Sequence, residues 1–126
     1  MVPSHIHTGI RGEKAAARYM EEQGYLVIQR NWRHGKSEID LICGKGSELV
    51  FVEVKTRQSG AFGEPECFVT SAKRSHMLKA ADAFLHALKG DYCLRFDVIS
   101  VKLFGTMMEL RHFEDAFHQS AIGWNT

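Results

Sequence analysis

Two apolar segments of this chain carry charged residues at positions that an ordinary buried strand fills with apolar ones. Asp40 lies in the first segment, and Glu53 and Lys55 lie in the second, after a short glycine-containing gap. Side chains in a strand alternate between the two faces, so Glu53 and Lys55 project on the same side. An Asp, a Glu and a Lys on one sheet face predict a divalent-metal site that hydrolyses phosphodiesters.

Phosphodiester hydrolysis explains why these residue types are needed together. The phosphate is anionic and repels hydroxide, whereas Mg²⁺ or Mn²⁺ neutralises it and lowers the pKa of bound water. Mg²⁺ prefers oxygen ligands, usually one or two carboxylates with water and substrate phosphate, which Asp40 and Glu53 would supply. Lys55 would then position the attacking water or stabilise the developing phosphorane charge. The alternative is a Glu53–Lys55 surface ion pair with Asp40 as a strand-end residue, but the apolar character of both segments argues against it.

The turn between the two segments decides whether the acids meet. We place Lys45 and Gly46 at the centre of this hairpin turn. Asp40 then lies opposite Phe51, and Glu53 is its diagonal neighbour on the same face, at roughly 7–8 Å. A slip of one residue would put the two acids on opposite faces.

Glu13 adds a third acid from a different element. Residues 8–23 read as a helix, with Thr8 as its N-cap and Gly24 just past its end. On a helical wheel Glu13 falls among apolar residues and away from the charged ones. A carboxylate that faces a core is costly unless it is paired or bound to metal. Glu13 is therefore either a further metal ligand or a first-turn residue that interacts with the helix dipole.

The whole chain predicts an α/β fold with the element order α-β-β-β-α-β-β, a mixed sheet flanked by helices. The strand at 49–56 is apolar on both faces near its start, which places it centrally in the sheet. Asp97 either pairs with Arg95 on its own strand face or helps to organise the site. The other expected elements are strands at 25–33, 38–43 and 94–103, a pairing segment at 107–111, a helix from Thr70 or Ser71 to Lys89, and a short terminal helix at 113–117.

Basic residues near these segments are candidates for holding phosphates. Arg33 precedes a turn and carries a guanidinium, which can bind phosphate through two hydrogen bonds. Lys73 lies in the first turn of the second helix, where a helix N-terminus favours anions, and Arg57 completes the set. Glu38 is either a fourth acid of the site or a solvated residue. Trp32 either stacks on a base or belongs to the core or a sheet edge.

Length, charge and cysteine content bound the class of protein. The chain of 126 residues predicts a single domain, residues 1–126, with one core. Its net charge is only +1, so any affinity for nucleic acid must come from clustered charge. No apolar run approaches the roughly 20 residues of a membrane helix, and the N-terminus lacks the features of a signal peptide. Three cysteines without a C-x-x-C pair suit a reducing compartment, so we expect a cytoplasmic protein without a membrane partner.

The motifs together resemble a known family. The chain is similar to the YraN-like bacterial proteins, uncharacterised protein family (UPF) 0102, over roughly residues 9–117, while the tail at 118–126 lies beyond the resemblance. The resemblance rests on Gly9-x-x-Gly12-Glu13-x-x-Ala16, Gly24-Tyr25, Asn31-x-Arg33, Glu38-Ile-Asp40-Leu-Ile42, Leu49-Val-Phe-Val-Glu53-Val-Lys55-x-Arg57, Lys73 and Arg95-Phe-Asp-Val-Ile99. One departure is Ser37, where the family usually has Gly before Glu-Ile-Asp; this leaves every candidate ligand intact.

The resemblance implies a restriction-endonuclease-like core and a metal-dependent endonuclease acting on DNA. It implies that the nuclease active-site positions are taken by Glu13, Asp40, Glu53 and Lys55. The family also resembles Holliday-junction resolvases in fold, which suggests branched or recombination intermediates by analogy only. The alternative is a nucleic-acid-binding or scaffold protein that keeps the fold without turnover. RNA is a further substrate that nothing in the sequence excludes.

Overall fold

A computed structural model describes the backbone of residues 4–58 and 65–117, with side chains from residue 9 onward within those ranges. Its strands form one five-stranded sheet in the order β1-β2-β3-β4-β5, antiparallel except for the parallel pair β3–β4. The elements are α1 (Ser4–Glu22), β1 (Leu26–His34), β2 (Ser37–Lys45), β3 (Glu48–Gln58), α2 (Ser71–Ala87), β4 (Cys93–Phe104) and β5 (Met107–Phe117). The predicted α/β class, mixed sheet and element order are confirmed, and β3 is central as expected. The predicted tail at 118–126 lies outside the described residues.

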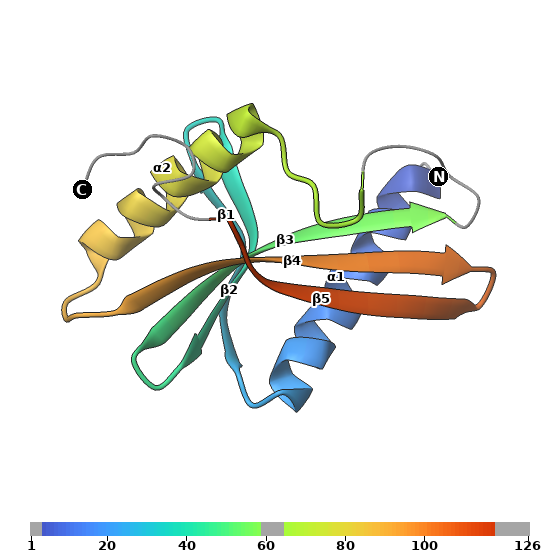
Figure 1. Ribbon diagram of the computed structural model, residues 1–126, viewed down its shortest axis with the longest axis horizontal. Helices are drawn as coiled ribbons and strands as arrows, with labels where there is room; N and C mark the ends of the chain where they lie inside the picture. Colours follow the sequence, from blue (N-terminus) through green and yellow to red (C-terminus); the bar gives the residue numbers. More distant parts are fainter. Residues whose placement is uncertain (1–3, 59–64, 118–126) are drawn as a thin grey trace.

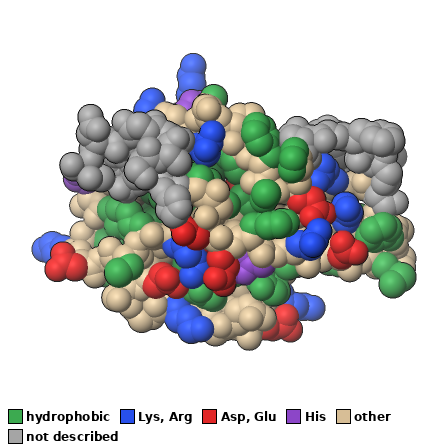
Figure 2. Space-filling view, viewed as in Figure 1, with side chains coloured by type: hydrophobic (Ala, Val, Ile, Leu, Met, Phe, Trp, Pro, Cys, Tyr) green, Lys and Arg blue, Asp and Glu red, His purple; other side chains and the backbone are tan. Residues whose placement is uncertain are grey.

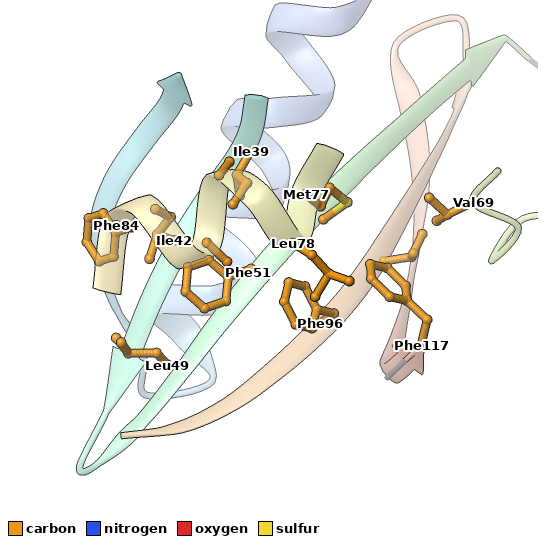
Figure 3. Close-up of a cluster of buried hydrophobic side chains, with 13 residues drawn as sticks. Ile39, Ile42, Leu49, Phe51, Val69, Met77, Leu78, Phe84, Phe96 and Phe117 are labelled. Atoms are coloured by element: carbon orange, nitrogen blue, oxygen red, sulfur yellow. The ribbon is translucent and has the colours of Figure 1, made fainter. Parts of the chain in front are cut away.

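The two helices cover opposite faces of a twisted sheet (Figure 1). Because α2 connects β3 to the parallel strand β4, it must cross one face of the sheet. Under α2, Phe84 packs into an apolar cluster that contains the stacked rings of Phe51 and Phe96 (Figure 3). Under α1, the fully buried Met20 packs with apolar residues of β2, β3 and β4. Burial of these two clusters fixes both helices against the sheet.

Gly12 allows α1 to lie very close to β3. A Cβ atom built on Gly12 would stand 1.8 Å from Oγ1 of Thr56, far inside van der Waals contact. A larger residue at this position would therefore have to move the helix or the strand. This contact holds α1 against β3 one residue before Glu13, and so it determines where that carboxylate lies.

The helix ends follow the capping rules, with one difference from prediction. α1 begins at Ser4, so Thr8 lies inside the helix rather than at its N-cap, because no Pro or Gly interrupts the residues between them. Gly24 ends α1 as predicted, with a φ of 93° that suits glycine. Thr70 caps α2 by accepting a hydrogen bond from the Lys73 N–H at 3.1 Å. Among the described residues, no helix is long and apolar enough to cross a membrane.

The prediction of a short terminal helix at 113–117 is wrong, because these residues complete strand β5. Phe113 pairs with Val98 and Phe117 with Phe96, with a register shift between the two pairs. Phe113 and Phe117 are four residues apart, which resembles a helical spacing. In the structure both rings reach the core through the strand instead, because strand residues an even number apart share a face and the bulge between them preserves this parity. Tertiary pairing therefore overrides the local pattern.

Candidate active site

The turn between β2 and β3 sets the register of the two acidic strands. It lies at Gly46–Ser47, one residue later than predicted. Backbone pairing ends at Leu41 and Val52, and continuing it by one pair sets Asp40 directly opposite Glu53 rather than diagonal to it. Moving a turn by one residue changes the register by two, so the two acids stay on the same face. The predicted meeting of the two carboxyl groups is thus observed, with closer opposition than expected.

Asp40 lies where β2 and β3 separate, a position that we call the strand fork. Beyond the Leu41–Val52 pair, the Val54 N–H donates a hydrogen bond to Oδ2 of Asp40 at 2.8 Å. The side chain thus satisfies a backbone donor that the strand ladder no longer pairs. Asp40 therefore has a local structural role, because the backbone of the neighbouring strand holds its carboxylate.

Glu53 is the most strongly perturbed acid of the fork. Its side chain is only 14% exposed and lies 3.5 Å from the Lys73 ammonium, measured from Oε2 to Nζ. Burial raises the pKa of Glu53 to about 8, helped by a hydrogen bond with Asp40 and the charge of Asp40, while Lys73 opposes the rise. Two carboxyl groups in hydrogen-bond contact cannot both stay ionised without help. They therefore need either a shared proton or a cation between them.

Glu13 reaches this region from α1, as its place on the helical wheel predicted. Its pKa is raised, first by burial and then by the charges of Asp40 and Glu38. A hydrogen bond with the Asn31 side chain opposes that rise. Asn31 adopts a positive φ of 50° within β1, a conformation that Asn tolerates better than most residues. Two acids of the fork are thus held in surroundings that disfavour their charged forms, a pattern typical of functional sites.

The fork offers a pair of carboxylates rather than a closed cage for a metal ion. Among the side chains of residues 9–58 and 65–117, no group of three from His, Cys, Asp or Glu is gathered closely enough to hold a metal by itself. Asp40 and Glu53 are in contact, whereas Glu13 is coupled to Asp40 through charge. Mg²⁺ is commonly bound by one or two carboxylates, with waters and substrate phosphates completing its shell. The donor set therefore fits Mg²⁺ or Mn²⁺ better than an ion that requires an all-protein cage.

Two lysines surround the acids, and their places differ from expectation. Lys55 shares a strand face with Glu53, but its ammonium donates to the carbonyl oxygens of Phe68 at 2.7 Å and Pro65 at 3.3 Å. Lys73 was expected only to hold phosphate, yet it is the cation 3.5 Å from Glu53. The helix α2 thus brings a positive charge to the acids, while Lys55 joins β3 to the segment that leads into α2.

The arginines occupy the margins of the site. Arg33 lies 3.2 Å from Glu38, its side chain is 74% exposed, and the two residues pair across the β1–β2 hairpin. Glu38 is nevertheless close enough to contribute to the raised pKa of Glu13, so it borders the fork. Arg57 is half-buried on β3, on the same strand face as Lys55. The structure thus brings Asp40, Glu53 and Lys73 into contact, whereas Arg33 pairs with Glu38.

Sequence reasoning missed Asn31 as a member of the site. Its amide hydrogen-bonds Glu13, which connects β1 to α1 beside the fork. The available signal was an Asn inside a strand rich in aromatic and β-branched residues, a position where Asn is unfavourable. An exception of this kind often marks a turn-like backbone, and the positive φ of Asn31 matches that interpretation.

Asp97 belongs to a separate polar network away from the fork. It is fully buried, and Arg95 Nε donates to its Oδ1 at 2.9 Å, so the predicted pairing is confirmed. Oδ2 lies 2.6 Å from Nε2 of His112, and Oδ1 accepts from the Asp115 N–H at 3.0 Å. The pKa of Asp97 is lowered because these hydrogen bonds, led by that of His112, outweigh the upward effect of burial. Asp97 therefore fastens β5 onto β4 at its bulge.

Comparison with known proteins places these residues within one family. The model of "Uncharacterised protein family UPF0102" matches residues 12–101. A UPF0102 protein of Bacteroides thetaiotaomicron is 41% identical over 114 residues, which cover 90% of this chain and 94% of the relative. UPF0102 proteins of Nitratidesulfovibrio vulgaris and Geobacter metallireducens are 42% and 43% identical, covering 93% and 86% of this chain and 88% and 90% of their own lengths. The matched residues include Glu13, Asp40, Glu53, Lys55 and Lys73.

Proposed function

Because the chain belongs to the uncharacterised protein family UPF0102, whose name states no activity, we propose its function from the strand fork itself. We propose that the protein is a Mg²⁺- or Mn²⁺-dependent endonuclease that hydrolyses phosphodiester bonds in DNA. The observation that carries this proposal is the contact between Asp40 and Glu53, with the pKa of Glu53 raised to about 8. A carboxyl pair of this kind has the right charge and oxygen ligands to exchange its proton for a divalent cation.

Each acid has a distinct part in this proposal. Asp40, held by the Val54 N–H, presents its carboxylate to the metal in a fixed orientation. Glu53 would supply the second carboxylate, and Glu13 would bind the metal from α1, directly or through water. When bound, the metal would neutralise the phosphate and lower the pKa of the attacking water. The Asn31 amide holds Glu13 in place for this task.

The two lysines interact with different negative charges. The carbonyls of Pro65 and Phe68 orient the Lys55 ammonium, which positions the attacking water and stabilises the charge that develops on the phosphate. Lys73 offsets the charge of Glu53 and lies at the start of α2, where a phosphate is favoured. Arg33 and Arg57 hold more distant phosphates of the bound strand.

A non-catalytic scaffold or nucleic-acid-binding protein is the competing function. The hydrogen bond between Asp40 and the Val54 N–H favours it in part, because this bond supports the fold without any metal. The scaffold alternative gives no reason, however, for a second carboxyl group against Asp40, where Glu53 costs stability in its charged form. Metal binding explains why the Asp40 and Glu53 carboxyl groups lie in contact.

Cleavage assays separate the two functions. Branched, nicked and single-stranded DNA and single-stranded RNA are incubated with Mg²⁺ or Mn²⁺ and the parent, Glu53→Gln or Glu109→Gln. Glu109 is exposed on β5 and provides a control with the same charge change. We expect cleavage by the parent and by Glu109→Gln, and none by Glu53→Gln. Absence of cleavage on every substrate, or equal cleavage by all three proteins, would favour the scaffold.

A further inference from the structure

A second feature of possible function is a hollow between α2 and the β1–β2 hairpin, which we call the hairpin–α2 groove. Its volume is about 790 Å³. The hairpin side contributes His34 and Lys36, and α2 contributes His76, Lys79 and His86. The three α2 residues are separated by three and then seven positions, so they form one stripe along the helix.

Basic side chains outnumber acidic ones along this groove. Two lysines and three histidines face a single acid, Asp82. The His86 Nδ1 is 2.7 Å from the backbone carbonyl oxygen of Asp82 and 3.7 Å from its carboxylate Oδ2. With a net charge of only +1 for the whole chain, this concentration of basic groups is unusual for the molecule. An anionic ligand is the partner that such a recess complements.

Trp32 joins the two sides of the groove by a hydrogen bond and a ring contact. The indole Nε1 of Trp32 donates to the Ala80 carbonyl at 3.0 Å, which ties β1 to α2. The Trp32 ring also packs edge-on against Phe84, with 5.3 Å between ring centroids. The sequence left two roles open for Trp32, and these contacts assign it to the core. Because Trp32 bridges both walls, the width of the groove is set by packing.

The groove is lined by residues close in sequence to those of the strand fork. Ser37 lines it on the hairpin side, three residues before Asp40 on the same strand. On α2, His76 lies one helical turn after Lys73, whose ammonium is next to Glu53. The groove and the fork therefore share the elements β2 and α2.

We propose that the hairpin–α2 groove binds a single strand of nucleic acid that continues from the strand fork. The ammonium groups of Lys36 and Lys79 contact phosphates, and the exposed imidazoles of His34, His76 and His86 stack on unpaired bases. Basic side chains interleaved with flat rings are the usual means of holding a single strand. A duplex is a poorer fit because its bases are stacked on one another, so their faces are not available to the imidazoles. This inference names the substrate class of the proposed nuclease and rests on that function only for its position beside the fork.

Binding can be measured without cleavage. Fluorescence anisotropy of a labelled single-stranded DNA, the matching RNA and the blunt DNA duplex is recorded in EDTA over a range of salt concentrations. The double variant Lys36→Ala/Lys79→Ala is compared with Lys14→Ala/Lys89→Ala, in which two exposed lysines elsewhere are removed for the same change in charge. A second variant, His76→Ala, tests the stacking contribution.

We expect the groove lysine variant to bind a single strand at least tenfold more weakly than the control double variant. Its slope of log affinity against log salt should fall by about 1.4, since two phosphate contacts at about 0.7 each are lost. His76→Ala should weaken binding without changing that slope. Tighter binding of either single strand than of the duplex supports the groove inference. Whichever of the DNA and RNA strands binds more tightly shows whether the groove prefers deoxyribose or ribose. Equal binding by groove and control variants, tightest binding of the duplex, or no binding of any probe would overturn it.

The outcomes for the groove and for the nuclease are separable. Glu53→Gln lies outside the groove and should bind the single strand like the parent while losing cleavage. If the parent binds through the groove but never cleaves, the groove inference stands and the nuclease fails. If the parent cleaves while the groove variants bind and cleave like the control, the nuclease stands and the groove inference fails.

Discussion

Glu53 connects the electrostatics of the fork to the stability of the protein. Its pKa rises from 4.5 to about 8 on folding, mainly through burial and then through Asp40. Between those values the folded protein holds a proton that the unfolded chain has released. The contribution of this proton to stability is therefore complete below about pH 4.5 and is lost as the pH rises through about 8. An ordinary surface glutamate has no such effect.

This shift predicts how the stability of the metal-free protein depends on pH. Its free energy of unfolding should fall by up to about 1.4 kcal/mol for each pH unit between those limits, because one proton is involved. Glu53→Gln should remove most of that slope and should melt at a higher temperature than the parent at alkaline pH. Denaturant unfolding in EDTA across this range provides the measurement. Parallel curves for the two proteins would show that Glu53 does not carry the proton.

Asp40 is expected to combine a structural hydrogen bond with a metal-binding role, and two substitutions separate these. Asp40→Asn keeps an oxygen that can accept from the Val54 N–H, whereas Asp40→Ala leaves that donor unpaired. Asp40→Ala should therefore lose about 1–3 kcal/mol of stability relative to Asp40→Asn. Neither variant should gain stability from Mg²⁺. Equal stability of the two variants in EDTA would mean that the hydrogen bond does not support the fold.

At the scale of elements, the site depends on how the segment before α2 is fastened to the sheet. Lys55 binds the carbonyls of Pro65 and Phe68, and Glu66 lies 3.2 Å from Lys102 on β4 and 2.9 Å from Arg111 on β5. The pKa of Glu66 is lowered, first by its hydrogen bond with Lys102. This anchoring holds the start of α2, and with it Lys73, beside the fork.

Lys55→Met separates a chemical role of Lys55 from its anchoring role. If the ammonium stabilises the transition state, cleavage should fall by about a hundredfold or more while Mg²⁺ affinity changes little. Calorimetric titration of Mg²⁺ and a thermal melt, made alongside the cleavage assay, report whether the metal affinity and the stability of the fold are intact. Normal cleavage by a folded Lys55→Met protein would remove Lys55 from the mechanism.

The contact between α1 and β3 offers a second test at this scale. Gly12→Ala adds a Cβ that meets Thr56, so the helix must shift at an expected cost of about 1–3 kcal/mol. The shift also displaces Glu13, so cleavage should fall as well. Gly9→Ala is the matched control, because a Cβ at Gly9 meets nothing within 4 Å and Ala favours a helix by up to about 1 kcal/mol. Similar melting temperatures and activities for the two variants would contradict this role of Gly12.

At the scale of the whole molecule, charge is mixed rather than uniformly basic. On the face shown in Figure 2, acidic and basic side chains lie side by side, and hydrophobic side chains gather at the right-hand edge over the tip of the β4–β5 hairpin. Two of the exposed apolar residues at that tip are Phe104 and Met107. A mixed surface gives little general attraction for nucleic acid, so affinity must come from local groups such as those of the hairpin–α2 groove.

The sequence predicted the fold well where patterns were local. The strand parity of Asp40 and Glu53 survives an error in the turn, because moving the turn by one residue preserves the shared face. The local sequence pattern could not predict the strand at 113–117. Its pairing with β4 and the bulge at Asp97 depend on residues distant in sequence. Nor could it place the ammonium groups of Lys55 and Lys73, because long flexible side chains follow the tertiary surroundings.

The most direct test of the metal site is the effect of Mg²⁺ on thermal stability, which requires no knowledge of the substrate. The parent, Asp40→Asn and Glu53→Gln are melted near pH 8 with EDTA and with increasing Mg²⁺. In EDTA both variants should melt at the temperature of the parent or above it, because each relieves the repulsion between the carboxyl groups. Mg²⁺ should raise the melting temperature of the parent alone, because it binds the folded state selectively. A large loss of stability in both variants in EDTA, with no effect of Mg²⁺ on the parent, would contradict a metal site and identify the acids as parts of the scaffold.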